Sequence, residues 1–291
     1  MTAHHAIARP APHPDHRRTR AMPSTPDATP DRTRPADPAP DVRTERIGTS
    51  LLITLDRPRA RNAVNAAVAA GLARALDELA ADPALRAGVL TGAGGTFSAG
   101  MDLKAALAGE SPEIPGRGFG GLTETVTPKP LIAAVEGWAM GGGFELALAC
   151  DLIVAADDAR FGLPEVKRGL VAAGGGAIRL PKRIPYHLAM ELLLTGEPVS
   201  GERAGLLGIA NRVVPAGETV STALELAAQL AANAPLALAA VKKIAHAADG
   251  TPEPAAFAAQ RRETAALAAS ADVREGMTAF AERRAPVWQG K

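Results

Sequence analysis

Cysteine and aromatic residues are scarce in this 291-residue chain, which has one cysteine and 3% aromatic residues. Because Cys150 has no second cysteine to pair with, an internal disulfide and a zinc site built on several cysteines are excluded. A reducing, cytoplasmic setting is therefore expected. No stretch has the roughly eighteen uncharged apolar residues of a membrane span, and the net charge of +1 gives no footprint for nucleic acid. We expect neither a membrane nor a nucleic acid as partner.

The first forty-odd residues have no apolar run and are rich in Pro, Arg, Asp and Thr. Such a segment cannot bury enough surface to offset its ordering entropy, so a disordered tail is predicted over residues 1–43. It also lacks the apolar centre of a secretory signal. Met22 is an alternative start, so the place of residues 1–21 in the native protein is left open.

From residue 50 onward, short apolar strands alternate with helices. Strands are predicted at 51–56, 87–92, 130–137 and from 151 onward, and Asn62 is predicted to cap a helix over about 63–81. This alternation is typical of parallel strands in an α/β fold. We expect residues 44–199 to form a core that carries the active site.

After about residue 186 the pattern predicts helices alone. They span 186–195, 200–207, 218–233, 235–248, 254–270 and 272–284. Hydrophobic residues make up 47% of the chain, much of it alanine, which suits helices packed closely through small side chains. We expect residues 200–291 to form a helical region that packs against a neighbouring subunit.

Three glycine-rich stretches carry the candidate chemistry. "TFSAGMDL" (96–103) follows a buried strand but fits neither a nucleophile elbow nor a dinucleotide fingerprint. In "MGGGFEL" (140–146), the glycines allow backbone N–H groups at a helix start to face an oxyanion. The third stretch, 160–185, holds Glu165 and a second triple glycine.

Glu145 is a lone acid in an otherwise apolar helix, and burial of an unpaired carboxylate is costly. Glu145 and Glu165 each follow a strand end and lie near a glycine cluster. Two carboxylates placed in this way can divide acid and base roles between them. The pattern therefore favours one shared site.

Taken in order, these segments resemble the crotonase (enoyl-CoA hydratase/isomerase) superfamily. The resemblance covers residues 44–290 and rests on "RPRARNAVN" (57–65), "TGAGGTFSAGMDLK" (91–104), "KPLIAAVEGWAMGGGFELALACDLIVAADDARFGLPEVKRGL" (129–170), "GGGAIRLPKRIP" (174–185) and "LLLTGEPVSGERAGLLGIANRVVP" (192–215). It implies an α/β fold, a spiral of ββα units with a helical C-terminal region that forms trimers. The trimers of this family often pair into hexamers.

The resemblance also implies a reaction. An acyl-CoA thioester would place its carbonyl oxygen on the backbone N–H groups of Met101 and Gly142. Glu145 would activate water and Glu165 would exchange the proton at the α-carbon. The implied activity is reversible hydration of trans-2-enoyl-CoA to 3-hydroxyacyl-CoA, as in fatty-acid β-oxidation. No metal and no separate cofactor are expected, because coenzyme A is part of the substrate.

Coenzyme A itself is expected to contact three parts of the chain. The residues that match family positions for this contact are Arg59, Ala60, Arg61, Ala99, Asp102, Leu103, Lys104, Phe280 and Arg283. The last two approach coenzyme A from a neighbouring subunit in some members. A homotrimer or a dimer of trimers is therefore expected.

Two departures from the family pattern bear on the reaction. Ala173 replaces a glycine whose N–H helps to place the water, and Leu163 replaces a polar residue often found two positions before Glu165. "LPEVKRGL" and "RLPKRIP" also resemble a sub-branch that includes carnitinyl-CoA dehydratase-like enzymes. Dehydration, double-bond isomerisation and non-catalytic acyl-CoA binding stay open as alternatives. The acyl group is unspecified, because its wall is expected to be the irregular segment 105–127.

Overall fold

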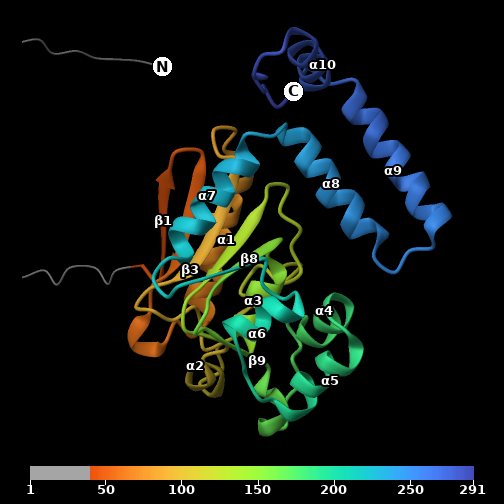
Figure 1. Cartoon of the computed structure of the whole chain (residues 1–291). Helices are drawn as coiled ribbons and strands as arrows, with labels where there is room; N and C mark the ends of the chain where they lie inside the picture. Colours follow the sequence, from red (N-terminus) through yellow and green to blue (C-terminus); the bar gives the residue numbers. More distant parts are fainter. Residues whose placement is uncertain (1–39) are drawn as a thin grey trace, which may run out of the picture. The chain divides into compact units, whose positions relative to one another are not determined.

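The computed structural model describes residues 40–291 (Figure 1). The predicted tail therefore lies outside the described residues up to position 39. Strand β1 begins at Val42, within the last residues of that predicted segment. It continues to Ile47 because its backbone pairs antiparallel with the next strand, β2 (Ser50–Leu55), across a tight turn.

A six-stranded sheet with the order β1-β2-β3-β6-β8-β11 forms the framework. Its remaining members are β3 (Ala87–Gly92), β6 (Leu131–Val135), β8 (Leu152–Ala156) and β11 (Arg212–Val214). Every pairing from β2 to β11 is parallel, as the alternation of strands and helices predicted. A smaller sheet has the order β10-β9-β7, and β4 and β5 form a separate hairpin. These short strands are β7 (Trp138–Met140), β9 (Arg160–Gly162), β10 (Val199–Ser200), β4 (Glu113–Ile114) and β5 (Gly118–Phe119).

Helices and two 3-10 turns connect the strands. They are η1 (Pro58–Ala60), α1 (Ala66–Ala81), α2 (Leu103–Leu107), α3 (Gly142–Ala149), η2 (Pro164–Arg168), α4 (Gly176–Arg183), α5 (Tyr186–Thr195), α6 (Gly201–Leu207), α7 (Thr219–Ala231), α8 (Pro235–Ala248), α9 (Glu253–Ala268) and α10 (Ala271–Glu282). The predicted C-terminal helices are confirmed, and α5 and α8 have the predicted bounds.

The chain winds through both sheets in a repeated strand–strand–helix order. β6 belongs to the large sheet, β7 to the small sheet, and α3 follows; β8, β9 and η2 repeat the order. An earlier turn has the same course, since β3 leads to Ser98, which bridges Ala139 of β7, and then to α2. The expected spiral of ββα units is therefore confirmed.

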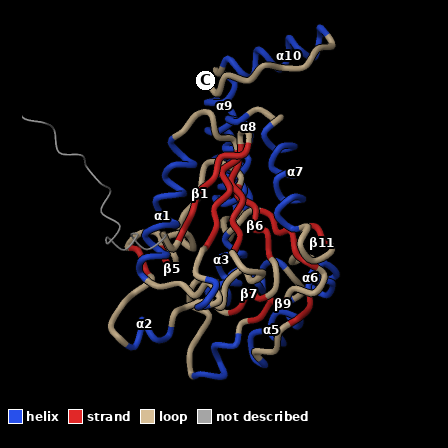
Figure 2. Tube along the Cα trace, turned by 90° about the vertical axis from the view of Figure 1, so that its left-hand side faces the viewer, coloured by secondary structure: helices blue, strands red, loops and turns tan. Residues whose placement is uncertain are grey.

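Hydrophobic cores cover both faces of the large sheet, and α1 and α7 lie on its opposite sides (Figure 2). On one face, Leu72 and Leu76 of α1 pack in a cluster with side chains of β2 such as Ile53. On the other face, Ala223 and Ala227 of α7 pack in a second cluster with buried side chains of β3, β6 and β8 such as Ile132. The alanine-rich composition thus allows α7 to approach the sheet closely.

Three local predictions differ from the structure. The cap of α1 is Asn65, whose side chain accepts a hydrogen bond from the Val68 N–H at 3.0 Å, and not Asn62. Strands do not end near residue 186, because β11 adds a parallel strand beside β8. Helix α4 was not predicted, since Pro181 interrupts its sequence pattern.

Helices α8 and α9 differ from the body in their burial. No residue of α8 or α9 is buried, although both helices are fully described, and they pack chiefly on each other. The C-terminus returns to the body, where Trp288 donates a hydrogen bond to the Ala232 carbonyl at 2.8 Å. In residues 40–291, no single helix has the length and hydrophobicity of a membrane span. Among the described residues, only α7 and α8 taken together have that length and hydrophobicity, and a bend of 105° separates the two helices.

Candidate active site

The three glycine-rich stretches meet at the carboxyl ends of the small-sheet strands. Met140 pairs with Gly162 across β7 and β9, and the Gly141 N–H donates to the Gly162 carbonyl at 2.8 Å. Turns that leave neighbouring parallel strands at the same edge are where ligands of α/β proteins tend to bind. A cavity of about 290 Å³ lies at this edge, lined by Arg61, Ala99, Met101, Leu103, Trp138, Met140, Gly141, Gly142, Pro164, Glu165, Arg168 and Leu170.

The two residues predicted to bind the thioester oxygen lie on touching turns. A Cβ atom on Gly100 would lie 2.5 Å from the Met140 carbonyl oxygen and 2.9 Å from the Gly142 nitrogen, so only glycine fits there. Met101 forms a parallel bridge with Val64. In this bridge the Val64 N–H donates to the Gly100 carbonyl, and the Val64 carbonyl accepts from the Asp102 N–H. In such a bridge the N–H of Met101 points away from Val64. Gly142 begins α3, so its N–H is among those that no intrahelical carbonyl accepts.

Glu145 lies in the first turn of α3, with 4% of its surface exposed. Its Oε1 accepts a hydrogen bond from the Gly176 N–H at 2.8 Å. Burial, with a smaller contribution from the charge of Glu165, raises the pKa of Glu145 to about 7, although the N–H groups of Gly176 and Gly174 and the Arg179 charge oppose the rise. A carboxyl group with this pKa can exchange protons near neutral pH.

Glu165 lies in η2, directly after Pro164, and its side chain is half-buried and lines the cavity. Burial raises its pKa, which its own backbone N–H and the Arg168 charge oppose. Its Oε2 is buried and accepts no hydrogen bond from the described residues. Since buried carboxylate oxygens are normally hydrogen-bonded, this atom needs a partner from solvent or from a ligand. This oxygen is thus a candidate for a hydrogen bond with a bound molecule.

Part of the predicted coenzyme A contact lies at the same cavity. Arg61, Ala99 and Leu103 line it, and the Ala99 N–H donates to the Arg61 carbonyl at 2.9 Å. The Asp102 side chain caps α2 by accepting from the N–H groups of Lys104 and Ala105. It also forms an ion pair of 3.0 Å with the Arg57 guanidinium. The loops around these residues are therefore bound together.

The other predicted contacts lie away from the cavity in this chain. Arg59 and Lys104 are exposed, and Ala60 ends η1. Phe280, which is 87% exposed, and the exposed Arg283 belong to α10 and its cap and do not line the cavity. Their contact with coenzyme A across a subunit boundary stays a prediction.

Several residues of the site were missed by sequence reasoning. The side chain of the buried Asn62 donates to the carbonyls of Ala93 and Thr96 and so fixes the loop before "SAG". Phe119 of β5 lies against the active-site glycines: a Cβ atom on Gly142 would lie 2.4 Å from its ring. Residues this far apart in the chain show no spacing signal that would join them.

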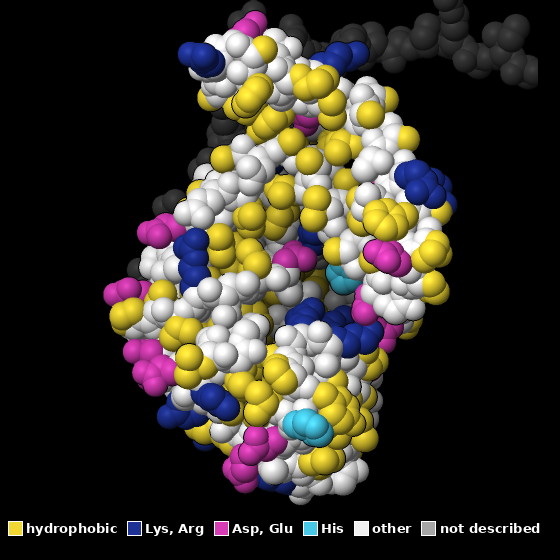
Figure 3. Space-filling view, turned by 45° about the vertical axis from the view of Figure 1, so that its right-hand side comes forward, with side chains coloured by type: hydrophobic (Ala, Val, Ile, Leu, Met, Phe, Trp, Pro, Cys, Tyr) yellow, Lys and Arg dark blue, Asp and Glu magenta, His cyan; other side chains and the backbone are white. Residues whose placement is uncertain are grey.

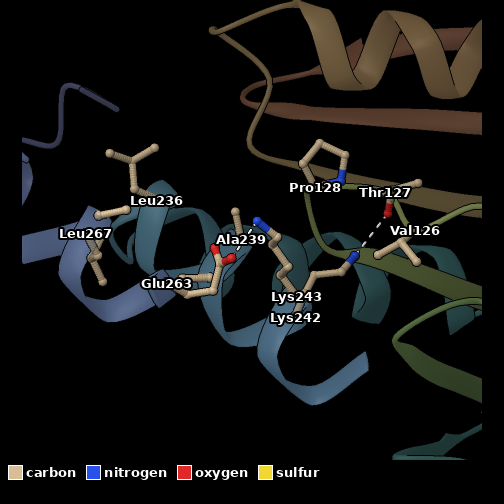
Figure 4. Close-up of a pocket in the computed structure, with 11 residues that line it drawn as sticks. Val126, Thr127, Pro128, Leu236, Ala239, Lys242, Lys243, Glu263 and Leu267 are labelled. Carbon is tan, nitrogen blue, oxygen red and sulfur yellow. Dashed lines mark hydrogen bonds and ion pairs between the residues drawn. The ribbon is translucent and has the colours of Figure 1, made fainter. Parts of the chain in front are cut away.

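A larger cavity of about 480 Å³ lies elsewhere, between α8, α9 and residues 126–128 (Figure 4). Its charged groups are already paired. Lys242 donates to Thr127 Oγ1 at 3.0 Å and to the Asp151 carboxylate at 2.6 Å, and Lys243 pairs with Glu263 at 2.6 Å. Volume alone therefore does not mark the active site, and the cavity with Glu165 and the two touching turns is the better candidate.

Comparison with known proteins identifies the family of the chain. Residues 46–291 match the family model "Enoyl-CoA hydratase/isomerase". A carnitinyl-CoA dehydratase of Salmonella typhi is 48% identical over 255 residues, which is 84% of this chain and 97% of the relative. The crystal structure of an enoyl-CoA hydratase from Mycobacterium tuberculosis H37Rv is 52% identical with a TM-score of 0.85, covering 87% of this chain and 100% of that one. A carnitinyl-CoA dehydratase from Mycobacterium avium 104 is 48% identical with a TM-score of 0.70 over 87% and 100% of the two chains. With the sequence motifs, the ββα spiral and these relatives in agreement, the chain belongs to the crotonase (enoyl-CoA hydratase/isomerase) superfamily.

Proposed function

We propose that this protein catalyses the reversible addition of water to a trans-2-enoyl-CoA, giving a 3-hydroxyacyl-CoA. The observation that carries the proposal is the pair of shielded carboxyl groups, Glu145 and Glu165, whose pKa values are both raised. The two carboxyl groups interact, and Glu165 lies beside the turn of Gly142. Family membership supports hydration or dehydration as the class of reaction.

In the proposed mechanism, the thioester oxygen accepts hydrogen bonds from the N–H groups of Met101 and Gly142. Glu145, ionised, takes a proton from water as the oxygen attacks the β-carbon. The electron pair of the double bond moves towards the thioester, where the two N–H groups stabilise the enolate charge. Glu165, protonated, then donates its proton to the α-carbon. Dehydration follows the same path in reverse, with no metal and no cofactor beyond the coenzyme A of the substrate.

Dehydration of a carnitinyl-CoA is the second candidate, favoured by the names of similar proteins. Isomerisation is less favoured, because isomerases of this family commonly keep one of the two glutamates. The similar proteins include an enoyl-CoA hydratase as well as carnitinyl-CoA dehydratases, and the two glutamates require no more of the substrate than an enoyl thioester. The simple enoyl-CoA is therefore our first choice of substrate.

We propose that the active form is a trimer or a dimer of trimers. Large apolar side chains are exposed along the last three helices: Val241 is 64% exposed, Phe257 48% and Met277 63%. Hydrophobic side chains also gather along the upper part of the central hollow in Figure 3, above a group of charged side chains. Contiguous apolar surface of this kind usually marks a protein interface.

The test is the loss of enoyl-thioester absorbance with crotonyl-CoA, a panel of longer enoyl-CoAs and crotonobetainyl-CoA. Wild type should consume at least one of them, whereas Glu145→Gln and Glu165→Gln should each lose about a hundredfold or more of kcat. Sedimentation should show each variant in the wild-type oligomeric state. Failure of wild type on the whole panel would refute hydration and favour isomerisation or simple binding of acyl-CoA.

A further inference from the structure

A backbone loop only one chain thick separates the Glu145 carboxylate from a guanidinium group. A Cβ atom on Gly174 would lie 2.7 Å from Glu145 Oε2, and a Cβ atom on Gly175 would lie 2.1 Å from Arg179 Nη1. Gly175 also has a φ of +106°, a conformation that favours glycine. The second triple glycine therefore fits between two side chains of opposite charge.

We propose that Arg179 is a positioning residue of the hydration reaction: it clamps the loop 172–176 so that the loop's N–H groups hold the Glu145 carboxylate. The inference rests on the proposed function. Arg179 does not touch the substrate in this proposal. It acts through the backbone that contacts the catalytic base.

The contacts of Arg179 form a bridge between two segments. Its Nη1 donates to the Gly174 carbonyl at 3.2 Å, and its Nη2 donates to the Thr123 carbonyl. Thr123 is 1% exposed and belongs to the irregular segment 105–127, expected to form the acyl wall. The planar fork of a guanidinium can hold two carbonyl groups in fixed directions. Arg179 thereby fixes the loop against the wall.

The bridge continues to the base on the other side of the loop. The N–H of Gly176 donates to Glu145 Oε1 at 2.8 Å, and the N–H of Gly174 also favours the ionised carboxylate. Gly174 thus takes part in both contacts, since its carbonyl accepts from Arg179. Movement of the guanidinium would be transmitted to the Glu145 carboxylate through a single residue.

Charge adds to the effect of position. Two charged groups act on Glu145: Glu165 from η2, which opposes ionisation, and Arg179 from α4, which favours it. Arg179 in turn interacts with Glu124 on the wall and with Arg183 one turn along its helix. Arg179 is therefore the positive charge that acts on the base from the side of the loop.

Other cations of the same helix have different partners. Arg183 donates to the Leu148 carbonyl at the end of α3, and Lys182 pairs with Asp249 at 2.8 Å. Lys182 and Arg179 line the same hollow of about 460 Å³, but the Lys182 ammonium donates to Asp249 and not to a carbonyl of the loop. Lys182→Gln is therefore a matched control that removes one positive charge from the same hollow.

The experiment compares Arg179→Gln, Arg179→Lys and Lys182→Gln in the full-length protein. The pH dependence of kcat/KM and the carboxyl ¹³C titration of Glu145, assigned with Glu145→Gln, are measured for each. In Arg179→Gln, the acidic limb of the kcat/KM profile and the titration midpoint of the Glu145 carboxyl group should both move up by about 1 pH unit. The value of kcat should fall about tenfold or more. Arg179→Lys keeps the charge, so the limb should stay while kcat falls. Lys182→Gln should match wild type in both.

Wild-type values of kcat and midpoint in Arg179→Gln would overturn the proposal. If that variant does not fold, Arg179→Lys decides: full wild-type kcat would overturn the clamp, and lowered kcat with an unchanged limb supports it. The ¹³C titration needs no turnover. A shifted midpoint in a protein that hydrates nothing would therefore support the clamp while refuting the proposed function.

Discussion

Replacing Glu145 with glutamine should change the unfolding free energy, relative to wild type, in a way that depends on pH. The difference should favour the variant more at alkaline pH than at acidic pH. In the unfolded chain a glutamate titrates near 4.5, whereas burial raises the pKa of Glu145 in the folded protein to about 7. Between these two values the folded state holds a proton that the unfolded state has lost. Stability of wild type must therefore fall as pH rises through this window, and the fall must stop above pH 7.

The size of the effect follows from the shift. A pKa rise from 4.5 to about 7 corresponds to about 3 kcal/mol at about 1.4 kcal/mol per unit. Since Glu145 is 4% exposed, solvent screening reduces this little. Glutamine keeps an oxygen for the Gly176 N–H, but its amide nitrogen faces the Gly174 N–H. That cost is the same at every pH, so the pH dependence of the difference isolates the charge.

The assay is chemical denaturation of wild type and Glu145→Gln at pH 5, 6, 7 and 8, at one protein concentration. The difference in unfolding free energy should grow by about 2.5 kcal/mol in favour of the variant between pH 5 and pH 8, equivalent to about 7 °C in melting temperature. A difference that is constant over this range would refute the raised pKa of the buried Glu145 carboxyl group.

Three further predictions test the surroundings of the base. Gly174→Ala should lower kcat about tenfold or more, because the added Cβ would lie 2.7 Å from Glu145 Oε2; unchanged kcat in a steady-state assay would contradict that packing. Phe119→Ala should raise the kcat/KM ratio of an eight-carbon to a four-carbon enoyl-CoA about tenfold, because the ring fills space beside Gly142, and an unchanged ratio would place the acyl chain elsewhere. Cys150 is 2% exposed and burial raises the pKa of its thiol, so a thiol reagent at pH 8 should react only after denaturation; rapid labelling of the native protein would argue against this burial.

The sequence predicted the regular elements well where local patterns decide them. The strand over residues 87–92 and the helices α5 and α8 have the predicted bounds. The prediction of the α1 cap was wrong because two asparagines, Asn62 and Asn65, precede the helix. Asn62 has a φ of +54° and turns inward to bond loops more than thirty positions away. Local propensity carries no information about such contacts.

The candidate site shows the same division. Each glutamate could be singled out from an acid beside a strand end and a glycine cluster, and the family resemblance supplied their roles. Arg179 could not be singled out in this way, because its proposed role depends on hydrogen bonds to two carbonyl groups. One belongs to Thr123, 56 positions earlier, and the other to Gly174. Phe119 was likewise one apolar residue in an irregular segment. Only the folded chain shows which glycine it touches.

The strand–strand–helix winding separates two tasks along the chain. In each turn the first strand enters the large sheet, whose faces hold the cores, and the second enters the small sheet, whose edge presents the candidate reacting groups. Substitutions after β7 or β9 can therefore alter the chemistry while the large sheet keeps its register. Proteins with this fold can therefore acquire new activities through substitutions at the small sheet while the fold is retained.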